Sequence, residues 1–262
     1  MPTSALHVAR TGLEAQDARM RVIANNLANV GTTGFKRDRA NFATLAYQDA
    51  RVAGQQSSNE TTFAIGLNLG TGVSIESTTR IETQGSLNTT GNPLDLALAG
   101  GGYFQVQLPG GQLGYTRAGN FTRSADGLLV TAQGYPLQPQ ITVPEGTVSL
   151  SIAQDGTVSA VTAGSAEATS SGQITVASFP NPAGLQAAGD NFLFETGASG
   201  AAQIGVAGEG GRGHVRQGML EQSNVNVVEE LVDMIETQRA YEINSKMISA
   251  VDEMLRNANQ TL

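Results

Sequence analysis

Cysteine and tryptophan are both absent from the 262 residues of this chain. Without cysteine there can be no disulfide bond, thiolate metal ligand or cysteine nucleophile, and no redox compartment is favoured. Aromatic residues make up only 5% of the chain, as 8 Phe and 5 Tyr, which leaves little material for a sugar-binding aromatic platform. Proline is scarce (8 residues) and glycine abundant (32), a composition typical of thin β regions with many turns.

Positive charge is also in short supply. The 15 Lys and Arg residues face 23 Asp and Glu residues, for a net charge of −8, which argues against nucleic acid as the main partner. Residues 1–51 nevertheless hold seven Lys or Arg against four acids, a charge of +3 that leaves −11 for the remainder. Such asymmetry would let copies of the chain attract one another, although a solvated surface is the commoner explanation.

Long apolar runs are missing as well. No stretch approaches the roughly eighteen apolar residues of a membrane-spanning helix, so we expect no membrane insertion. Glu14, Asp17, Arg19 and Arg21 interrupt the N-terminal region, so we expect no cleaved secretory signal peptide.

Apolar residues recur every seven positions in the stretch 224–261 and predict a helix with one apolar face. The row consists of Val227, Met234, Tyr241, Ile248 and Leu255. It is widened to a stripe, which we expect to be buried, by Val228, Leu231, Ile235, Met247, Val251 and Met254. Asn226 followed by Glu229 resembles a capping box at the helix start. A helix of this length cannot bury its apolar face on itself and needs a partner.

A second row with the same period lies in the first thirty residues. It consists of Leu6, Leu13, Met20 and Leu27, widened by Ala9, Ile23 and Val30. Ser4 is placed to cap the start of this helix and Gly31 to follow its end. We therefore predict that the two terminal helices pair as in a coiled coil and that the middle of the chain is looped out. The alternative is two ordinary amphipathic helices docked on a globular core.

The middle of the chain has a different pattern. Residues 38–70 are polar and irregular, and 54–62 are expected to form a loop or linker. From 70 to 218, alternating apolar residues predict short strands, including 128–131, 135–137, 148–152, 173–179, 191–195 and 214–220. Asp126-Gly127 and Asp155-Gly156 favour tight turns, and 162–172 reads as an exposed loop. We predict an α+β fold whose β part is an antiparallel sandwich or irregular barrel.

Residues suited to catalysis are few and scattered. His7 and His214 are the only histidines, and neither has a second ligand at metal-binding spacing. Asp126 and Asp155 resemble a glycosidase pair only in type, since each precedes glycine in a predicted turn. The glycines at 100–102 lead into a predicted strand and not into a helix, which disfavours phosphate binding. We therefore predict no enzyme, and no catalytic, cofactor-binding or metal-binding residues.

Two long motifs at opposite ends resemble a known family. The run 24–37, ANNLANVGTTGFKR, and the run 223–246, SNVNVVEELVDMIETQRAYEINSK, are similar to the signatures of the bacterial flagellar axial proteins, the rod, hook and hook-associated group. The motif residues are Asn25, Asn26, Asn29, Gly34, Phe35, Gln238, Arg239 and Tyr241. From residue chemistry alone, the asparagines either contact neighbouring helices in a crowded bundle or mark a fraying helix end.

The resemblance covers the whole chain and implies a structural subunit of the distal rod. Such a subunit would self-assemble into a stiff tubular filament that transmits torque. Its implied partners are copies of itself, proximal rod proteins, the hook protein and the basal-body ring proteins. It would stand in the rod that spans the periplasm, after export without a cleaved signal. The expected self-assembly residues are Leu6, Leu13, Met20, Ile23, Leu27, Leu231, Met234, Tyr241, Ile248 and Leu255.

The resemblance also assigns parts of the chain. It implies a helical domain of 1–34 with 223–262, a linking segment of 35–75 and an outer β domain of 76–222. Tyr115, Arg117 and Arg123 resemble a β-domain motif that belongs to the fold. The loop at 54–62 resembles a segment that reaches adjacent subunits and stiffens the rod; the alternative is a disordered surface loop. Its expected residues are Gln55, Gln56, Ser57, Ser58, Thr61 and Thr62.

Two other functions stay open at this stage. One is a proximal rod or hook-type protein of the same family. The other, from a different class, is a secreted β protein that binds or hydrolyses carbohydrate.

Overall fold

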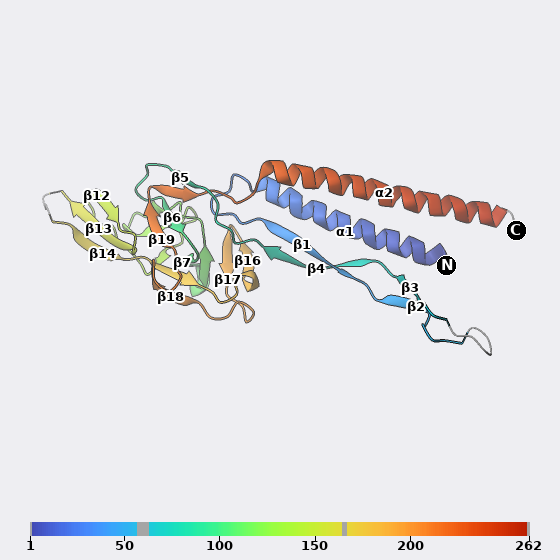
Figure 1. Cartoon of the computed structure of the whole chain (residues 1–262). Helices are drawn as coiled ribbons and strands as arrows, with labels where there is room; N and C mark the ends of the chain where they lie inside the picture. Colours follow the sequence, from blue (N-terminus) through green and yellow to red (C-terminus); the bar gives the residue numbers. More distant parts are fainter. Residues whose placement is uncertain (1, 57–62, 164–166, 261–262) are drawn as a thin grey trace. The chain divides into compact units, whose positions relative to one another are not determined.

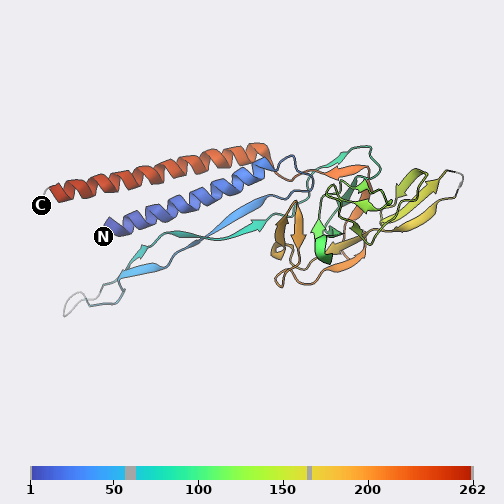
Figure 2. The same cartoon turned by 180° about the vertical axis from the view of Figure 1, so that it is seen from behind.

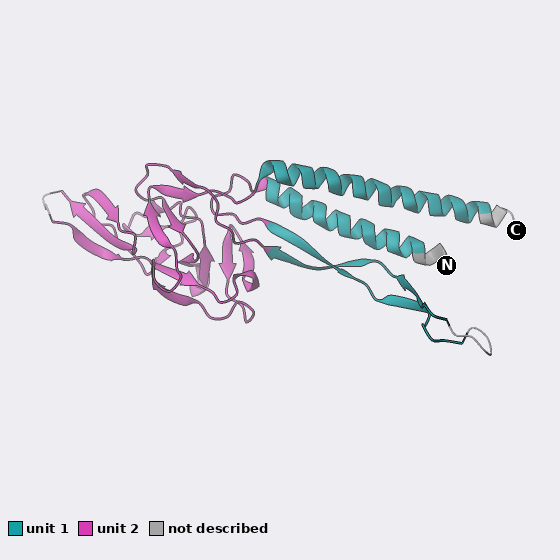
Figure 3. Cartoon of the chain, viewed as in Figure 1, with its two compact units in different colours: residues 1–27, 38–79, 226–262 teal, residues 28–37, 80–225 magenta. Residues whose placement is uncertain are grey.

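The computed structural model describes residues 2–56, 63–163 and 167–260 (Figure 1). A helix at each end and antiparallel strands between them confirm the predicted α+β class. Within the described residues the strands form several separate sheets, and none closes into a barrel. The chain divides into two compact units, unit 1 (residues 1–27, 38–79 and 226–262) and unit 2 (28–37 and 80–225) (Figure 3).

Unit 1 contains both predicted helices, α1 (Pro2–Ala28) and α2 (Val227–Gln260). They lie side by side and antiparallel in both views (Figures 1 and 2). The predicted cap of α2 is confirmed, because the Val228 N–H donates to Asn226 Oδ1 at 3.1 Å. The predicted start of α1 was wrong, whereas Gly31 follows the end of the helix, as expected. The helix begins at Pro2, a residue suited to a first turn that needs no N–H donor, so Ser4 lies inside it and Val30 beyond its end.

Unit 1 also contains strands in the region expected to be irregular. β1 (Asp38–Thr44) pairs with β4 (Val73–Arg80), and β2 (Tyr47–Arg51) pairs antiparallel with β3 (Leu67–Gly70). β1, β2 and β3 were not predicted from the sequence. Nearly every side chain of β2 and β3 is exposed. Strands without a buried face carry no apolar alternation.

Unit 2 is built from antiparallel sheets. The largest has the order β16-β17-β8-β7-β15-β18, with β11 pairing with β7. Its strands are β7 (Tyr103–Gln107), β8 (Leu113–Thr116), β11 (Leu137–Gln138), β15 (Thr175–Ser178), β16 (Gln186–Gly189), β17 (Phe192–Phe194) and β18 (Gln203–Val206). Three two-stranded sheets pair β5 (Leu87–Thr89) with β20 (Met219–Glu221), β6 (Leu96–Ala99) with β19 (His214–Gln217), and β9 (Thr122–Arg123) with β10 (Leu129–Val130). Two 3₁₀ turns, η1 (Pro109–Gly111) and η2 (Pro182–Gly184), interrupt the strands.

A separate three-stranded sheet contains β12 (Thr147–Ile152), β13 (Thr157–Thr162) and β14 (Thr169–Gln173). β14 corrects the expectation of a loop at 162–172, because residues 169–172 pair antiparallel with β13. Residues 164–166 of the expected loop lie outside the described residues. The predicted turns are confirmed. Gly127 and Gly156 have φ of 79° and 88°, a conformation that glycine adopts without steric cost.

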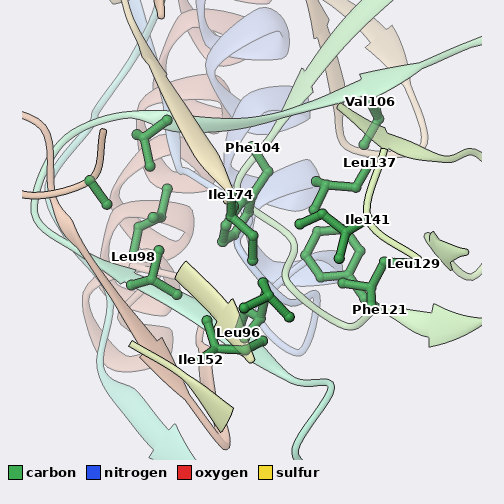
Figure 4. Packing of buried hydrophobic residues seen from close by; sticks show 14 of the residues in the cluster. Leu96, Leu98, Phe104, Val106, Phe121, Leu129, Leu137, Ile141, Ile152 and Ile174 are labelled. Atoms are coloured by element: carbon green, nitrogen blue, oxygen red, sulfur yellow. The ribbon is translucent and has the colours of Figure 1, made fainter. Parts of the chain in front are cut away.

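The hydrophobic core lies in unit 2, where apolar side chains from several sheets converge (Figure 4). Phe104 and Phe121 pack edge to face with their ring centroids 5.3 Å apart. The labelled members are all buried: Leu96, Leu98, Phe104, Val106, Phe121, Leu129, Leu137, Ile141, Ile152 and Ile174. Burial of such side chains contributes about 1.5–3 kcal/mol each, so unit 2 has a substantial core of its own.

Tyr103 gives unit 2 an alkaline pH dependence. Its side chain packs against Phe179, and burial, together with the Glu82 carboxylate, raises its pKa well above the ordinary value. Above about pH 10 the unfolded chain releases this proton while the folded chain keeps it, so stability falls as pH rises. We expect Tyr103→Phe to flatten the decline in urea midpoint between about pH 9 and 11. Tyr47→Phe, at an exposed tyrosine, should leave it unchanged; an equal decline in both variants would contradict this assignment.

Candidate assembly surfaces

The contact between α1 and α2 contains polar side chains. Asn26 Nδ2 donates to both carboxylate oxygens of Glu230, at 3.3 and 3.2 Å, and each of these residues is 1% exposed. One turn further along α2, Asp233 Oδ1 accepts a hydrogen bond from Arg19 Nη2 at 3.4 Å. This second pair is partly exposed, where ion pairs stabilise little.

Both helices also carry small side chains. On α1, Ala9 and Ala15 are buried. A Cβ atom on Gly12 would lie 3.1 Å from Asn244 Nδ2 of α2, so the helices approach closely at this point. Ala240, one turn before Asn244, is half-buried. Within one copy, Glu230 and Asn244 are the α2 residues shown to meet α1, and the larger Met234, Ile248 and Leu255 are half-buried.

Most of the large apolar side chains of α2 are instead exposed. Six of them are 47% to 70% exposed: Val228, Val232, Ile235, Ile243, Met247 and Met254. Their spacings are close to multiples of one helical turn, so they share one side of the helix. We call these six residues the outer face of α2. It is opposite the side that contains Glu230, Thr237 and Asn244.

The structure places the expected self-assembly residues in different environments. On α1, Ile23 is buried, and the half-buried residues are Leu6, Leu13, Met20 and Leu27. On α2, Met234, Ile248 and Leu255 are half-buried, while Leu231 and Tyr241 are exposed. The seven-residue row of α2 thus follows the margin of the helix contact. Sequence reasoning missed the row nearest α1, Glu230, Thr237 and Asn244, which also has a spacing of seven but is polar.

The strands of unit 1 carry further exposed apolar side chains. Tyr47, Leu67, Leu69 and Ile75 are among them. Of the expected stiffening residues, Gln55 and Gln56 are exposed. The Phe63 N–H donates to the Gln55 carbonyl at 2.9 Å. The remaining four, Ser57, Ser58, Thr61 and Thr62, lie outside the described residues.

The other motif residues are divided between surface and interior. Asn25, Gln238 and Arg239 are exposed, and Asn29 is half-buried. Gly34, in unit 2, is buried with φ of 69°. A Cβ atom there would lie 2.6 Å from the Arg117 carbonyl carbon. Neither the φ angle nor the space admits a larger residue at Gly34. Phe35, which follows it, is half-buried.

A buried charge cluster lies beside Gly34 in unit 2. Glu221 accepts hydrogen bonds from Lys36 Nζ at 2.5 Å, Arg117 Nε at 2.9 Å and the Gly85 N–H at 3.1 Å. The side chains of Lys36, Arg117 and Glu221 are 4%, 6% and 0% exposed. Burial lowers the pKa of the Lys36 ammonium, an effect that Glu221 opposes. Sequence reasoning missed Lys36 and Glu221, because they are 185 positions apart.

Asn224 extends this cluster through hydrogen bonds to the backbone. Its Nδ2 donates to the carbonyls of Ile81 and Thr83, at 2.8 and 3.0 Å. Its Oδ1 accepts from the Arg37 N–H at 2.8 Å, and its own N–H donates to the Phe35 carbonyl at 3.4 Å. Segments 34–37, 81–85 and 221–224 are thereby bound together. All three segments belong to unit 2, so the cluster and Asn224 stabilise unit 2 itself.

Residues considered for catalysis are not gathered into a site. Asp155 lies in an exposed turn, where the Thr157 N–H and hydroxyl donate to its carboxylate and lower its pKa. Asp126 also precedes a turn glycine. Across the part of the chain that the structure describes, no group of three or more His, Asp or Glu side chains is arranged to hold a metal ion. In the same residues, no helix combines the length and apolarity needed to cross a membrane.

Comparison with known families gives three matches along the chain. Residues 6–36 match the family described as flagella basal body rod protein. Residues 97–160 match the flagellar hook protein FlgE/F/G D1 domain. Residues 216–261 match the flagellar basal body rod FlgEFG protein C-terminal family. These ranges include both helices with their motifs and much of the core of unit 2.

Full-length relatives agree with these matches. The flagellar basal-body rod protein FlgG of Buchnera aphidicola from Acyrthosiphon pisum is 50% identical over 255 residues, which cover 97% of this chain and 98% of the relative. Its Caulobacter vibrioides namesake is 45% identical over 257 residues, 98% of each chain. The FlgF rod protein of Caulobacter vibrioides is 33% identical over 263 residues, covering 99% of this chain and 98% of that protein. The chain therefore resembles the FlgG relatives more than this FlgF relative.

Proposed function

Since the chain belongs to the family of flagellar basal-body rod proteins and is a structural component of the distal rod, we propose how it performs that role. Copies join through the outer face of α2, and polymerisation is itself the function, with no chemical step. The expected residues of α1 and α2, from Leu6 to Leu27 and from Leu231 to Leu255, line the resulting helical layer. The outer β domain of residues 76–222 surrounds it, joined by the segment 35–75.

The observation that carries this proposal is the distribution of side chains on α2. Its polar residues Glu230, Asp233 and Asn244 meet α1 within one copy, while most of its large apolar side chains, including the six of the outer face, are left exposed. Full burial of each of these side chains would contribute about 1.5–3 kcal/mol. Association with a second copy that covers them is therefore favourable. A contact between two different patches that does not close into a ring produces an open helical filament.

Stiffness of the polymer is sufficient to transmit torque. We propose that close-packed helices and interlocked β domains resist bending and twisting. The proposed neighbours are proximal rod proteins on one side, hook subunits on the other, and the ring proteins within which the rod turns. The proposed location is the periplasmic span of the basal body, reached by flagellar export without a cleaved signal.

Electron microscopy of the purified full-length chain tests this proposal. At high protein concentration we expect filaments or short tubes, because apolar faces that are exposed in one copy become buried between copies. Dilution should dissolve them. A chain that stays monomeric at every concentration, with its outer face accessible, would exclude self-assembly as its function.

Removal of residues 54–63 tests the rod-stiffening role proposed for Gln55, Gln56 and their neighbours. The distal rod assignment predicts polymers that are curved, whereas those of the full chain are straight. A proximal rod protein should be little affected. A second variant carries a Gly and Ser sequence of equal length, so it separates the effect of sequence from that of length. Straight polymers from the deletion variant would contradict the stiffening role.

A further inference from the structure

We propose that Asn26 is a register lock, meaning a residue that fixes the axial position of α2 along α1 and, with it, the start of β1. This role concerns a single copy and does not depend on polymerisation. Asn26 also belongs to the N-terminal motif, but family membership does not explain why a carboxamide is buried there. The explanation lies in its contacts, all of which are within unit 1.

Asn26 pairs with the backbone of Asp38 as a neighbouring strand would. Its Oδ1 accepts from the Asp38 N–H at 2.9 Å, and its Nδ2 donates to the Asp38 carbonyl at 2.9 Å. β1 begins at Asp38, so this carboxamide fixes the position at which the chain resumes after the turn that follows α1. The same Nδ2 also contacts the Glu230 carboxylate of α2. One side chain therefore joins α1, β1 and α2.

The remaining helix contact specifies register poorly. Gly12 and Ala240 are small, and small residues can pack in more than one offset. The large buried side chain of α1, Ile23, is apolar and forms no hydrogen bond. The Arg19–Asp233 pair is partly exposed and contributes little. A slip of one helical turn moves α2 by about 5.4 Å and takes the Glu230 carboxylate away from Asn26. A buried carboxylate that loses a hydrogen-bond donor is costly, so the lock excludes the shifted pairings.

Engineered disulfides can measure this register, because the chain contains no cysteine of its own. Gly12→Cys with Asn244→Cys joins positions that already approach closely. Gly12→Cys with Ala240→Cys, or with Ile248→Cys, reports a slip of one turn in either direction. In the otherwise unaltered full-length chain, we expect the 12–244 disulfide to form at least tenfold faster than the other two. Failure of the 12–244 pair to form would overturn the proposal.

The lock itself is then removed in a variant that keeps the contact apolar. Asn26→Leu combined with Glu230→Leu replaces both side chains, so that neither the carboxamide nor the carboxylate is left buried without the other. The Asp38 N–H and carbonyl lose their Asn26 contacts in the same variant. We expect helix pairing to persist and the three disulfides to form at comparable rates. Arg19→Leu with Asp233→Leu is the matched control. In this variant the 12–244 disulfide should still form faster than the 12–240 and 12–248 disulfides. If the 12–244 disulfide still formed at least tenfold faster than the other two in the Asn26 and Glu230 variant, packing would set the register, contrary to the proposal.

Exchange of donor and acceptor gives a second, independent readout. Asn26→Asp places two carboxylates together in a buried contact and should abolish the 12–244 disulfide. Addition of Glu230→Gln restores an amide donor opposite the new carboxylate, so we expect the disulfide to return at least in part. A double variant no better than the single one would contradict a direct contact between these side chains. Intramolecular disulfides are identified by peptide mass spectrometry on the dilute chain and do not require polymers.

Discussion

Ile243→Asp should abolish polymerisation of the full-length chain while both units remain folded. Ile243 is 61% exposed at the middle of the outer face of α2, so the substitution removes no large contact within one copy. Between copies, it removes about 1.5–3 kcal/mol of apolar burial and introduces a carboxylate whose desolvation costs more. We expect the concentration needed for polymerisation to rise more than tenfold, as measured by sedimentation.

Ser245→Asp is the matched control for this experiment. It adds the same charge to the same helix at an exposed position that does not belong to the outer face. Its effect on polymerisation should be much smaller, and circular dichroism should show equal helix content in the two variants. Normal polymerisation of the Ile243 variant would mean that another surface joins the copies, which would remove the main support for the proposed function.

The sequence predicts the helices of unit 1 better than their contacts. The seven-residue rows correctly indicate α1 and α2, because a repeated apolar spacing close to the helical period is a local property of the chain. Which side of α2 faces α1 depends on partners that the sequence pattern cannot identify. Glu230 is buried with the Asn26 amide donating to its carboxylate, and a glutamate in a helical pattern is ordinarily assigned to the surface.

The same reasoning explains what was missed elsewhere. Strands were predicted only where apolar and polar residues alternate in the sequence. β14 contains only Thr, Ser, Gly and Gln, so it was not predicted. Lys36, Arg117 and Glu221 come from three distant segments, so local spacing gives no sign of their contact. Gly34 offered a usable signal, since a motif glycine indicates a backbone that admits no side chain. Its neighbour in space, Arg117, could not be deduced in the same way.

Glu221→Ala should destabilise unit 2 more than any other single substitution discussed above. It leaves the cations of Lys36 and Arg117 buried without the carboxylate that both contact. Removal of one partner from a buried ion pair typically costs about 3–5 kcal/mol. For a domain of this size, we expect the melting temperature to fall by about 10 °C. Near-ultraviolet circular dichroism follows the transition, because three of the five tyrosines, including Tyr103, belong to unit 2.

Two further variants separate charge from packing. Glu145→Ala, at an exposed glutamate of unit 2, should change the melting temperature by no more than about 1–2 °C, because isolated surface charges stabilise little. Lys36→Met keeps the Arg117–Glu221 pair and removes the cation that burial disfavours, so it should cost less than Glu221→Ala.

If Glu221→Ala were as mild as Glu145→Ala, the cluster would not stabilise segments 34–37, 81–85 and 221–224. These segments would then have to be held together by the hydrogen bonds of Asn224, and Asn224→Ala should instead produce the large loss.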